Sequence, residues 1–188
     1  MAQRTNSGDM GGDSRLIKIV VTGPESTGKT TLTEALALHL NIPWIPEYAR
    51  SYVEGLNRPY TYQDVEIIAR YQVKQEKEIS ASKLTGIFLM DTWLIMTKVW
   101  LEMVYGSCPE WIEHYISIAK IDLFLVCKPD LPWINDPVRE NGGEMRNILF
   151  DRYCEEIKLH SFPFSIVEGN GEIRLQNALG LLRQHHII

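Results

Sequence analysis

The segment Gly23-Pro24-Glu25-Ser26-Thr27-Gly28-Lys29-Thr30 fits the pattern G-x-x-x-x-G-K-[ST] at every fixed position. It follows the apolar run 16–22 and precedes a segment whose apolar residues recur at helical spacings of three and four. This context predicts a phosphate-binding loop, in which backbone N–H groups and Lys29 hold the phosphates of ATP and the Thr30 hydroxyl ligates Mg²⁺. The residues expected to contact ATP, in this segment and directly after it, are Gly23, Glu25, Ser26, Thr27, Gly28, Lys29, Thr30 and Thr31.

Short apolar runs alternate with longer amphipathic stretches along the rest of the chain. The runs are 16–22, 44–45, 87–90, 121–127 and 164–167. Runs that are apolar at successive positions are typical of strands covered on both faces, and helix-like crossovers between them indicate parallel strands. The sequence therefore predicts an α/β fold of the P-loop NTPase type, a doubly wound parallel sheet with helices on both faces.

Length and composition indicate one soluble domain. The chain has 188 residues and a formal net charge of −5, and no apolar stretch approaches the ~20 residues of a membrane helix. We therefore expect a cytoplasmic protein that does not bind a membrane. We also expect no nucleic acid polymer as a partner, because neutralising many phosphates requires a basic surface. Residues 1–14, which are rich in Gly, Ser and Asp, are predicted to form a flexible tail, and residues 15–188 the domain.

The three cysteines form no recognisable framework. Cys108, Cys127 and Cys154 are widely spaced and include no C-x-x-C pair. We expect reduced thiols rather than disulfides or a zinc site.

The motifs that would indicate hydrolysis are missing. The chain has no Asn-Lys-x-Asp element, with which a GTPase reads guanine. The run 87–90 is followed by Asp91-Thr92 and not by the Asp-Glu pair with which hydrolytic motors activate water. Both absences favour transfer of a phosphoryl group to an acceptor.

Two acids follow predicted strands, where ligands of an open α/β sheet bind. Glu47 follows the run 44–45, and Asp91 follows the run 87–90. Phosphoryl transfer to a hydroxyl needs one carboxylate that accepts its proton and another that helps to hold Mg²⁺. We favour Asp91 as the base, with Glu47 as the alternative. As non-catalytic alternatives, Asp91 would cap the next helix and Glu47 would pair with Arg50 on the surface.

Three further polar residues are candidates for ligand contacts. Gln72 lies on the apolar stripe of a helix predicted over 62–82, so its amide needs a partner, either a ligand or the backbone or water. Arg139 and Arg146 lie on a Gly-containing segment that we interpret as a lid over the triphosphate. Their alternative is ordinary solvated charge.

The arrangement resembles the ribosylnicotinamide kinase domain of NadR-type proteins of NAD metabolism. The resemblance rests on the phosphate loop, Glu47-Tyr-Ala-Arg50, the strand end Asp91-Thr92, and Trp133-Ile-Asn-Asp136-Pro-Val-Arg139. It implies a nucleoside-kinase-like fold with a lid loop and ATP-dependent phosphorylation of the 5′-hydroxyl of nicotinamide riboside. By this likeness Asp91 and Glu47 would serve the acceptor and Mg²⁺, and Arg139 the lid. With the residues discussed above, the predicted acceptor contacts are Glu47, Tyr48, Arg50, Gln72, Asp91 and Thr92, the metal ligands Thr30 and Asp91, and the triphosphate contacts outside the loop Arg139 and Arg146.

The chain also departs from that family. Members with two activities carry an adenylyltransferase domain marked by a His-x-Gly-His element, which this sequence lacks, so we expect a kinase domain alone. Two other functions stay open: a kinase for another hydroxyl acceptor, such as a deoxynucleoside or coenzyme precursor, and a regulatory ATP-binding module without enzymatic activity. By fold analogy alone, the turn 169–171 is expected near the adenine.

Overall fold

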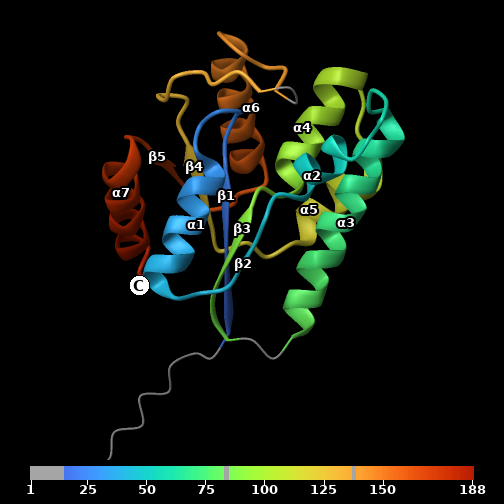
Figure 1. Cartoon of the computed structure of the whole chain (residues 1–188). Helices are drawn as coiled ribbons and strands as arrows, with labels where there is room; N and C mark the ends of the chain where they lie inside the picture. Colours follow the sequence, from blue (N-terminus) through green and yellow to red (C-terminus); the bar gives the residue numbers. More distant parts are fainter. Residues whose placement is uncertain (1–14, 83–84, 137–138) are drawn as a thin grey trace, which may run out of the picture.

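The computed structural model describes residues 15–82, 85–136 and 139–188 (Figure 1). The predicted tail, 1–14, lies outside the described residues. Among the described residues no helix combines the length and apolar character needed to cross a bilayer. Cys108, Cys127 and Cys154 are free thiols, as expected.

A five-stranded parallel sheet forms the centre of the domain, as the apolar runs predict. Its spatial order is β2-β3-β1-β4-β5. The strands are β1 (Leu16–Thr22), β2 (Trp44–Ile45), β3 (Gly86–Asp91), β4 (Leu123–Cys127) and β5 (Phe164–Val167). The prediction for β4 begins two residues early, because Ile121 and Asp122 precede the strand. Asp122 still bonds β1, since its N–H donates to the Lys18 carbonyl at 2.9 Å, but the Lys18 N–H donates to the Asp122 carboxylate at 2.7 Å and not to a backbone carbonyl.

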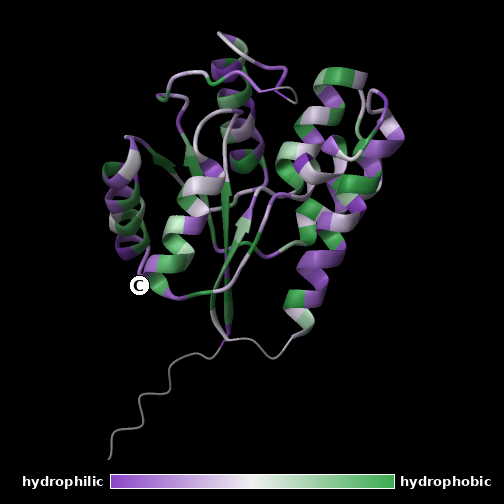
Figure 2. Ribbon diagram, in the orientation of Figure 1, coloured by the Kyte–Doolittle hydropathy of each residue, from purple (hydrophilic) through white to green (hydrophobic). Residues whose placement is uncertain are grey.

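Helices cover both faces of the sheet, which confirms the doubly wound architecture (Figure 1). They are α1 (Lys29–Leu40), α2 (Tyr48–Glu54), α3 (Tyr62–Ala81), α4 (Leu94–Tyr105), α5 (Glu110–Ile118), α6 (Met145–Leu159) and α7 (Gly171–Gln184). One face packs against α1 and α7, and the other against α3, α4, α5 and α6. In Figure 2 the central strands are hydrophobic while the helices carry hydrophilic residues on their outer sides.

The local sequence explains where the long helix α3 begins. Thr61 accepts the N–H of Asp64, and the Asp64 carboxylate accepts the Thr61 N–H at 2.7 Å, a reciprocal capping box. Val65, Ile68 and Gln72 are buried on one side of the helix, as their spacing predicts. The first turn of α3 is therefore held firmly beside the site described below.

Two buried lysines join the layers on the helix-rich side. Lys18 of β1 donates to the Glu76 carboxylate of α3 at 2.6 Å. Lys98 of α4 donates to Glu156 of α6 at 2.7 Å and to Glu102 at 2.8 Å. Each buried charge thus has a partner of opposite sign, as burial requires.

The topology brings the important strand ends to one edge. β1 lies between β3 and β4, and Val21 pairs with Asp91 on one side and with Leu125 on the other. The connection that leaves β1 therefore starts beside the end of β3 and the end of β4. The order of strands reverses here, which is where ligands of open α/β sheets bind.

The start of that connection allows only glycine. Gly23 has φ 141°, and a Cβ added to it would lie 2.6 Å from the carbonyl oxygen of Cys127. We expect Gly23→Ala to lower the free energy of unfolding by about 3 kcal/mol or more, because it combines backbone strain with a clash against backbone. Thermal or urea unfolding measures the loss.

Gly86→Ala is the matched control for this prediction. Gly86 also has positive φ, 87°, but no atom lies within 4 Å of a Cβ built there. Strain alone should cost about 1–2 kcal/mol. Equal losses for the two variants would contradict the importance of the close contact with β4.

Candidate active site

The phosphate loop connects β1 to α1 with an unusual backbone path. Ser26 and Gly28 adopt left-handed φ values of 56° and 72°, and Gly28 is the residue that precedes the first turn of α1. The Thr27 hydroxyl donates to the Pro24 carbonyl at 2.8 Å, and the Lys29 ammonium donates to the same oxygen at 3.0 Å. The loop thus curls around its own lysine at a helix N-terminus, where backbone N–H groups favour an anion.

A short hydrogen bond joins this loop to the end of β3. The Thr30 hydroxyl donates to Asp91 Oδ2 at 2.5 Å. Asp91 is almost completely buried, and its second oxygen, Oδ1, has no hydrogen-bond partner within the described residues. The two residues predicted to serve Mg²⁺ are therefore in direct contact.

The surroundings of Asp91 change its acidity. Burial raises the pKa of the Asp91 carboxyl to about 6, against the opposing effect of the Lys29 charge, and nearby Glu47 raises it further. Asp91 does not cap the next helix, since Trp93 precedes α4 and no side chain caps it. The non-catalytic alternative for Asp91 is not observed.

Glu47 lies at the end of β2 and faces the same space. It is half-buried, and its carboxylate makes no hydrogen bond or ion pair with any described residue. The alternative pairing with Arg50 is not observed, because Arg50 bonds Glu54 at 2.8 Å and Asp136 at 2.7 Å. Glu47 therefore presents an unengaged carboxylate.

A cavity of about 590 Å³ opens above the phosphate loop. One wall carries the loop residues 25–31 together with Glu47 and Arg50. The remainder is largely apolar and aromatic and comes from α2, α4, α6 and the segment before α3. These further residues are Ala49, Val53, Arg58, Pro59, Tyr60, Met96, Trp100, Met103, Val104, Met145, Leu149 and Tyr153, with Arg139, Glu140 and Asn141 from the predicted lid.

Part of the segment after β4 lines this cavity, with Arg139, Glu140 and Asn141, and its described residues are bonded on several sides. The Glu25 carboxylate accepts the N–H of Asn141 at 2.8 Å, and the Tyr60 hydroxyl donates to Glu140 at 2.7 Å. With the Arg50–Asp136 pair, these bonds attach the segment to the phosphate loop and to the opposite wall. Such a segment is placed to act as a lid.

The two predicted lid arginines lie in different places. Arg139 lines the cavity and donates to the Ile134 carbonyl at 2.8 Å. Arg146 is buried and is not among the lining residues, and it donates to the carbonyls of Leu131 and Ser26 at 2.9 and 3.0 Å. Arg139 can meet a ligand directly, whereas Arg146 contacts the loop backbone.

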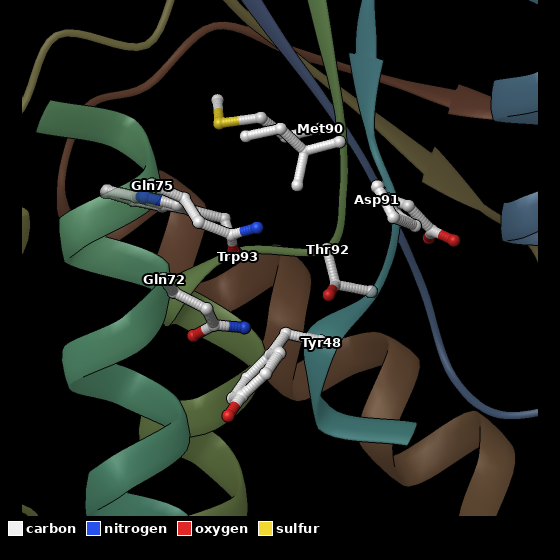
Figure 3. A pocket seen from close by; sticks show the side chains of 9 residues that line it. Tyr48, Gln72, Gln75, Met90, Asp91, Thr92 and Trp93 are labelled. Carbon is white, nitrogen blue, oxygen red and sulfur yellow. The ribbon is translucent and has the colours of Figure 1, made fainter. Parts of the chain in front are cut away.

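Four of the residues predicted to contact an acceptor line a separate, much smaller space, shown in Figure 3. Tyr48, Gln72, Asp91 and Thr92 surround about 10 Å³, enough for roughly one water molecule, and Asp91 is not among the residues that line the larger cavity. The Gln72 amide oxygen accepts the Thr97 hydroxyl at 2.7 Å, while Gln72 Nε2 and Thr92 Oγ1 have no partner in the described structure. Gln72 thus finds its main partner in a side chain of α4.

Sequence reasoning does not find several residues of the site. Tyr60, Trp100 and Tyr153 line the cavity, and none of them is among the ligand contacts predicted from the sequence. Two other aromatic residues have structural partners: Trp93 is buried and donates to Glu76 at 3.0 Å, and Tyr48 stacks on Tyr71 with ring centroids 3.8 Å apart. Spacing along the chain cannot predict which residues of four separate segments come together to line one cavity.

Comparison with known proteins places the chain in a family. Residues 18–174 match the family described as AAA domain. The chain belongs to this family. This chain is also 24% identical over 143 residues to the trifunctional NAD biosynthesis/regulator protein NadR of Salmonella typhimurium, a match covering 74% of the chain and 35% of the relative. The chain thus spans about a third of the length of that curated relative.

Solved structures show the same relation. A NadR protein in complex with NR has a TM-score of 0.74 and 25% identity, covering 90% of this chain and 51% of that one. Thymidylate kinase from Ehrlichia chaffeensis has a TM-score of 0.66 and 13% identity, covering 90% and 98%. The chain is therefore NadR-like, and it shares its fold with that kinase.

The buried Asp91 predicts a dependence of stability on pH. Its pKa of about 6 in the folded chain exceeds the ordinary 3.8, so its favourable contribution is complete below pH 3.8 and lost as the pH rises through 6. Asp91→Asn, whose amide oxygen still accepts from Thr30, should raise the stability of the ligand-free protein at pH 8 by about 2–3 kcal/mol.

Unfolding curves between pH 4 and pH 8 measure this effect. The advantage of Asp91→Asn should shrink towards pH 4, while Asp151→Asn, at an exposed position of α6, should show no such trend. An Asp91→Asn variant less stable than the parent at pH 8 would contradict the unfavourable free energy attributed to burying the ionised Asp91 carboxylate.

Proposed function

We propose that this chain is an ATP-dependent kinase that transfers the γ-phosphoryl group to the 5′-hydroxyl of a nucleoside, with nicotinamide riboside as the acceptor. One observation carries the proposal: the phosphate loop and the free carboxylate of Glu47 open onto one cavity whose opposite wall is apolar and aromatic. The likeness to NadR, one structure of which is in complex with NR, supports the choice of acceptor.

ATP would be held mainly by the loop. Residues 25–31, which include the N-terminus of α1, line the cavity, and Lys29 is one of them. Lys29 would exchange its bond to the Pro24 carbonyl for the β- and γ-phosphate oxygens. Such contacts stabilise the charge that develops on the transferring group.

The residues present fit a Mg²⁺ ion. The Thr30 hydroxyl and the Asp91 carboxylate are hard oxygen ligands already in contact, and Asp91 Oδ1 is buried without a partner. Mg²⁺ characteristically takes one or two protein ligands and completes its shell with phosphate oxygens and water. When bound, the ion would neutralise negative charge on the phosphates.

We assign the role of general base to Glu47 rather than to Asp91. Glu47 lines the cavity and has no competing partner, whereas Asp91 is hydrogen-bonded to Thr30 and buried beneath the loop. A base must come within hydrogen-bond reach of the hydroxyl proton, so exposure to the cavity is the first requirement. The 5′-hydroxyl would then lie between Glu47 and the terminal phosphate.

The distant wall suits a flat, positively charged ring. Tyr60 and Trp100 form an edge-to-face pair with ring centroids 4.9 Å apart, and Tyr153 lies on α6 beside the same cavity. Aromatic faces attract cations, and the pyridinium ring of nicotinamide riboside is both flat and cationic. A neutral deoxynucleoside base would stack there without this electrostatic gain.

Arg139 and the lid would protect the reaction from water. The bonds from Glu25 to Asn141 and from Tyr60 to Glu140 hold the segment across the cavity mouth. Arg139 would leave the Ile134 carbonyl for the triphosphate, adding positive charge where the transition state needs it. Exclusion of water favours transfer to the acceptor over hydrolysis.

The acceptor is tested directly. With ATP and Mg²⁺, nicotinamide riboside should give nicotinamide mononucleotide, detected by mass spectrometry, faster than any member of a panel of nucleosides and deoxynucleosides. Lys29→Ala should abolish product and excludes a contaminating kinase. A faster deoxynucleoside would overturn the acceptor, and ATP turnover independent of every acceptor would favour the regulatory module.

The division of labour between the carboxylates is tested by Glu47→Gln. We expect turnover to fall by about 10²–10⁴-fold with the affinity for ATP unchanged within about twofold, because only the proton acceptor is lost. Glu78→Gln, the same change on an exposed position of α3, should leave turnover unaffected. Near-normal turnover of Glu47→Gln would return the role to Asp91.

A further inference from the structure

Two buried arginines reach the phosphate loop from behind. Arg146 of α6 donates from Nη2 to the Ser26 carbonyl at 3.0 Å. Arg174 of α7 donates from Nη1 to the carbonyl of the next residue, Thr27. Both side chains are more than nine-tenths buried, and neither lines the cavity. The consecutive helices α6 and α7, both far from the loop in the sequence, thus donate hydrogen bonds to consecutive carbonyls of the loop.

These bonds determine where the loop N–H groups point. In a planar trans peptide the C=O and the N–H point in opposite directions. Holding the Ser26 carbonyl towards the protein turns the Thr27 N–H outward, and holding the Thr27 carbonyl does the same for the Gly28 N–H. Within the described residues neither N–H has an acceptor, and both residues line the cavity.

Each guanidinium is itself fixed by other acceptors. Arg174 also donates from Nε to the Gly169 carbonyl at 2.6 Å, and from Nη2 to the Lys128 carbonyl at 3.3 Å and to the Asp130 carboxylate. Arg146 also donates to the Leu131 carbonyl at 2.9 Å. A guanidinium has five donors in a rigid plane, so it can serve several fixed acceptors at once, which an ammonium group on a flexible stem cannot.

We propose that Arg146 and Arg174 are positioning residues for phosphate binding, which orient the N–H groups of Thr27 and Gly28 through the loop carbonyls without touching ATP. The proposal rests on the proposed function only in taking a polyphosphate as the ligand of the loop. It gives Arg146 a role different from the direct contact with triphosphate that the sequence suggests. The turn 169–171, expected near the adenine, contributes the Gly169 carbonyl that anchors Arg174.

The experiment measures the Kd of ATP by calorimetry without any acceptor, and the Kd of inorganic tripolyphosphate by competition. Arg146→Met and Arg174→Met should each raise both values tenfold or more, and by similar factors, because the lost N–H orientation affects only phosphates. Arg146→Lys and Arg174→Lys should bind as weakly, because they keep the charge and lose the fork. If a methionine variant does not fold, the Kd values of the corresponding lysine variant test the proposal in its place.

Lys18→Met is the matched control. Lys18 is a buried, ion-paired cation near the opposite end of β1, so its loss should lower the melting temperature but leave both Kd values within twofold. Unchanged Kd values in folded Arg146 and Arg174 variants would overturn the proposal, as would recovery of binding by lysine, which would mean that charge alone acts. Because no acceptor is present, a failure to phosphorylate nicotinamide riboside would affect the proposed function and not this test.

Discussion

The register of the central strand is the constraint on which the site depends. β1 is buried between β3 and β4, and its Val21 is paired with Asp91 and Leu125 at the same time. A slip of one residue between β1 and β3 would carry Asp91 to the other face of the sheet, away from Thr30. The apolar side chains on both faces oppose such a slip, so core packing is what holds the carboxylate against the phosphate loop.

The charges of the site are not fully matched in the free chain. Among the described residues, one oxygen of buried Asp91 has no hydrogen-bond partner, and the Lys29 ammonium donates to the Pro24 carbonyl alone. By contrast, the buried Lys18 is paired closely with Glu76. A ligand that brings phosphate and a cation would satisfy both groups. Relieving their unfavourable free energy in the free chain would then strengthen binding of that ligand.

What the sequence predicts correctly is local or repeats with a fixed period. The phosphate loop is contiguous, the strands are uninterrupted apolar runs, and Glu47 and Asp91 follow strands whose ends meet at one edge. Periodicity also indicates that Gln72 is buried, but its partner Thr97 lies on another helix. Arg174 contacts Thr27 across 147 residues, and no spacing rule connects them. Contacts between elements had to come from the three-dimensional structure.

The net charge of −5 does not oppose the binding of a polyphosphate, because Glu25 and Asp91 near the loop, unlike Glu47, are locally compensated. Glu25 accepts the N–H groups of Glu140 and Asn141, and burial favours the neutral form of Asp91 by raising its pKa. The field at the cavity wall therefore comes mainly from oriented N–H groups and Lys29, with two buried guanidinium groups behind them. Such a field acts over a few ångströms and suits a single triphosphate.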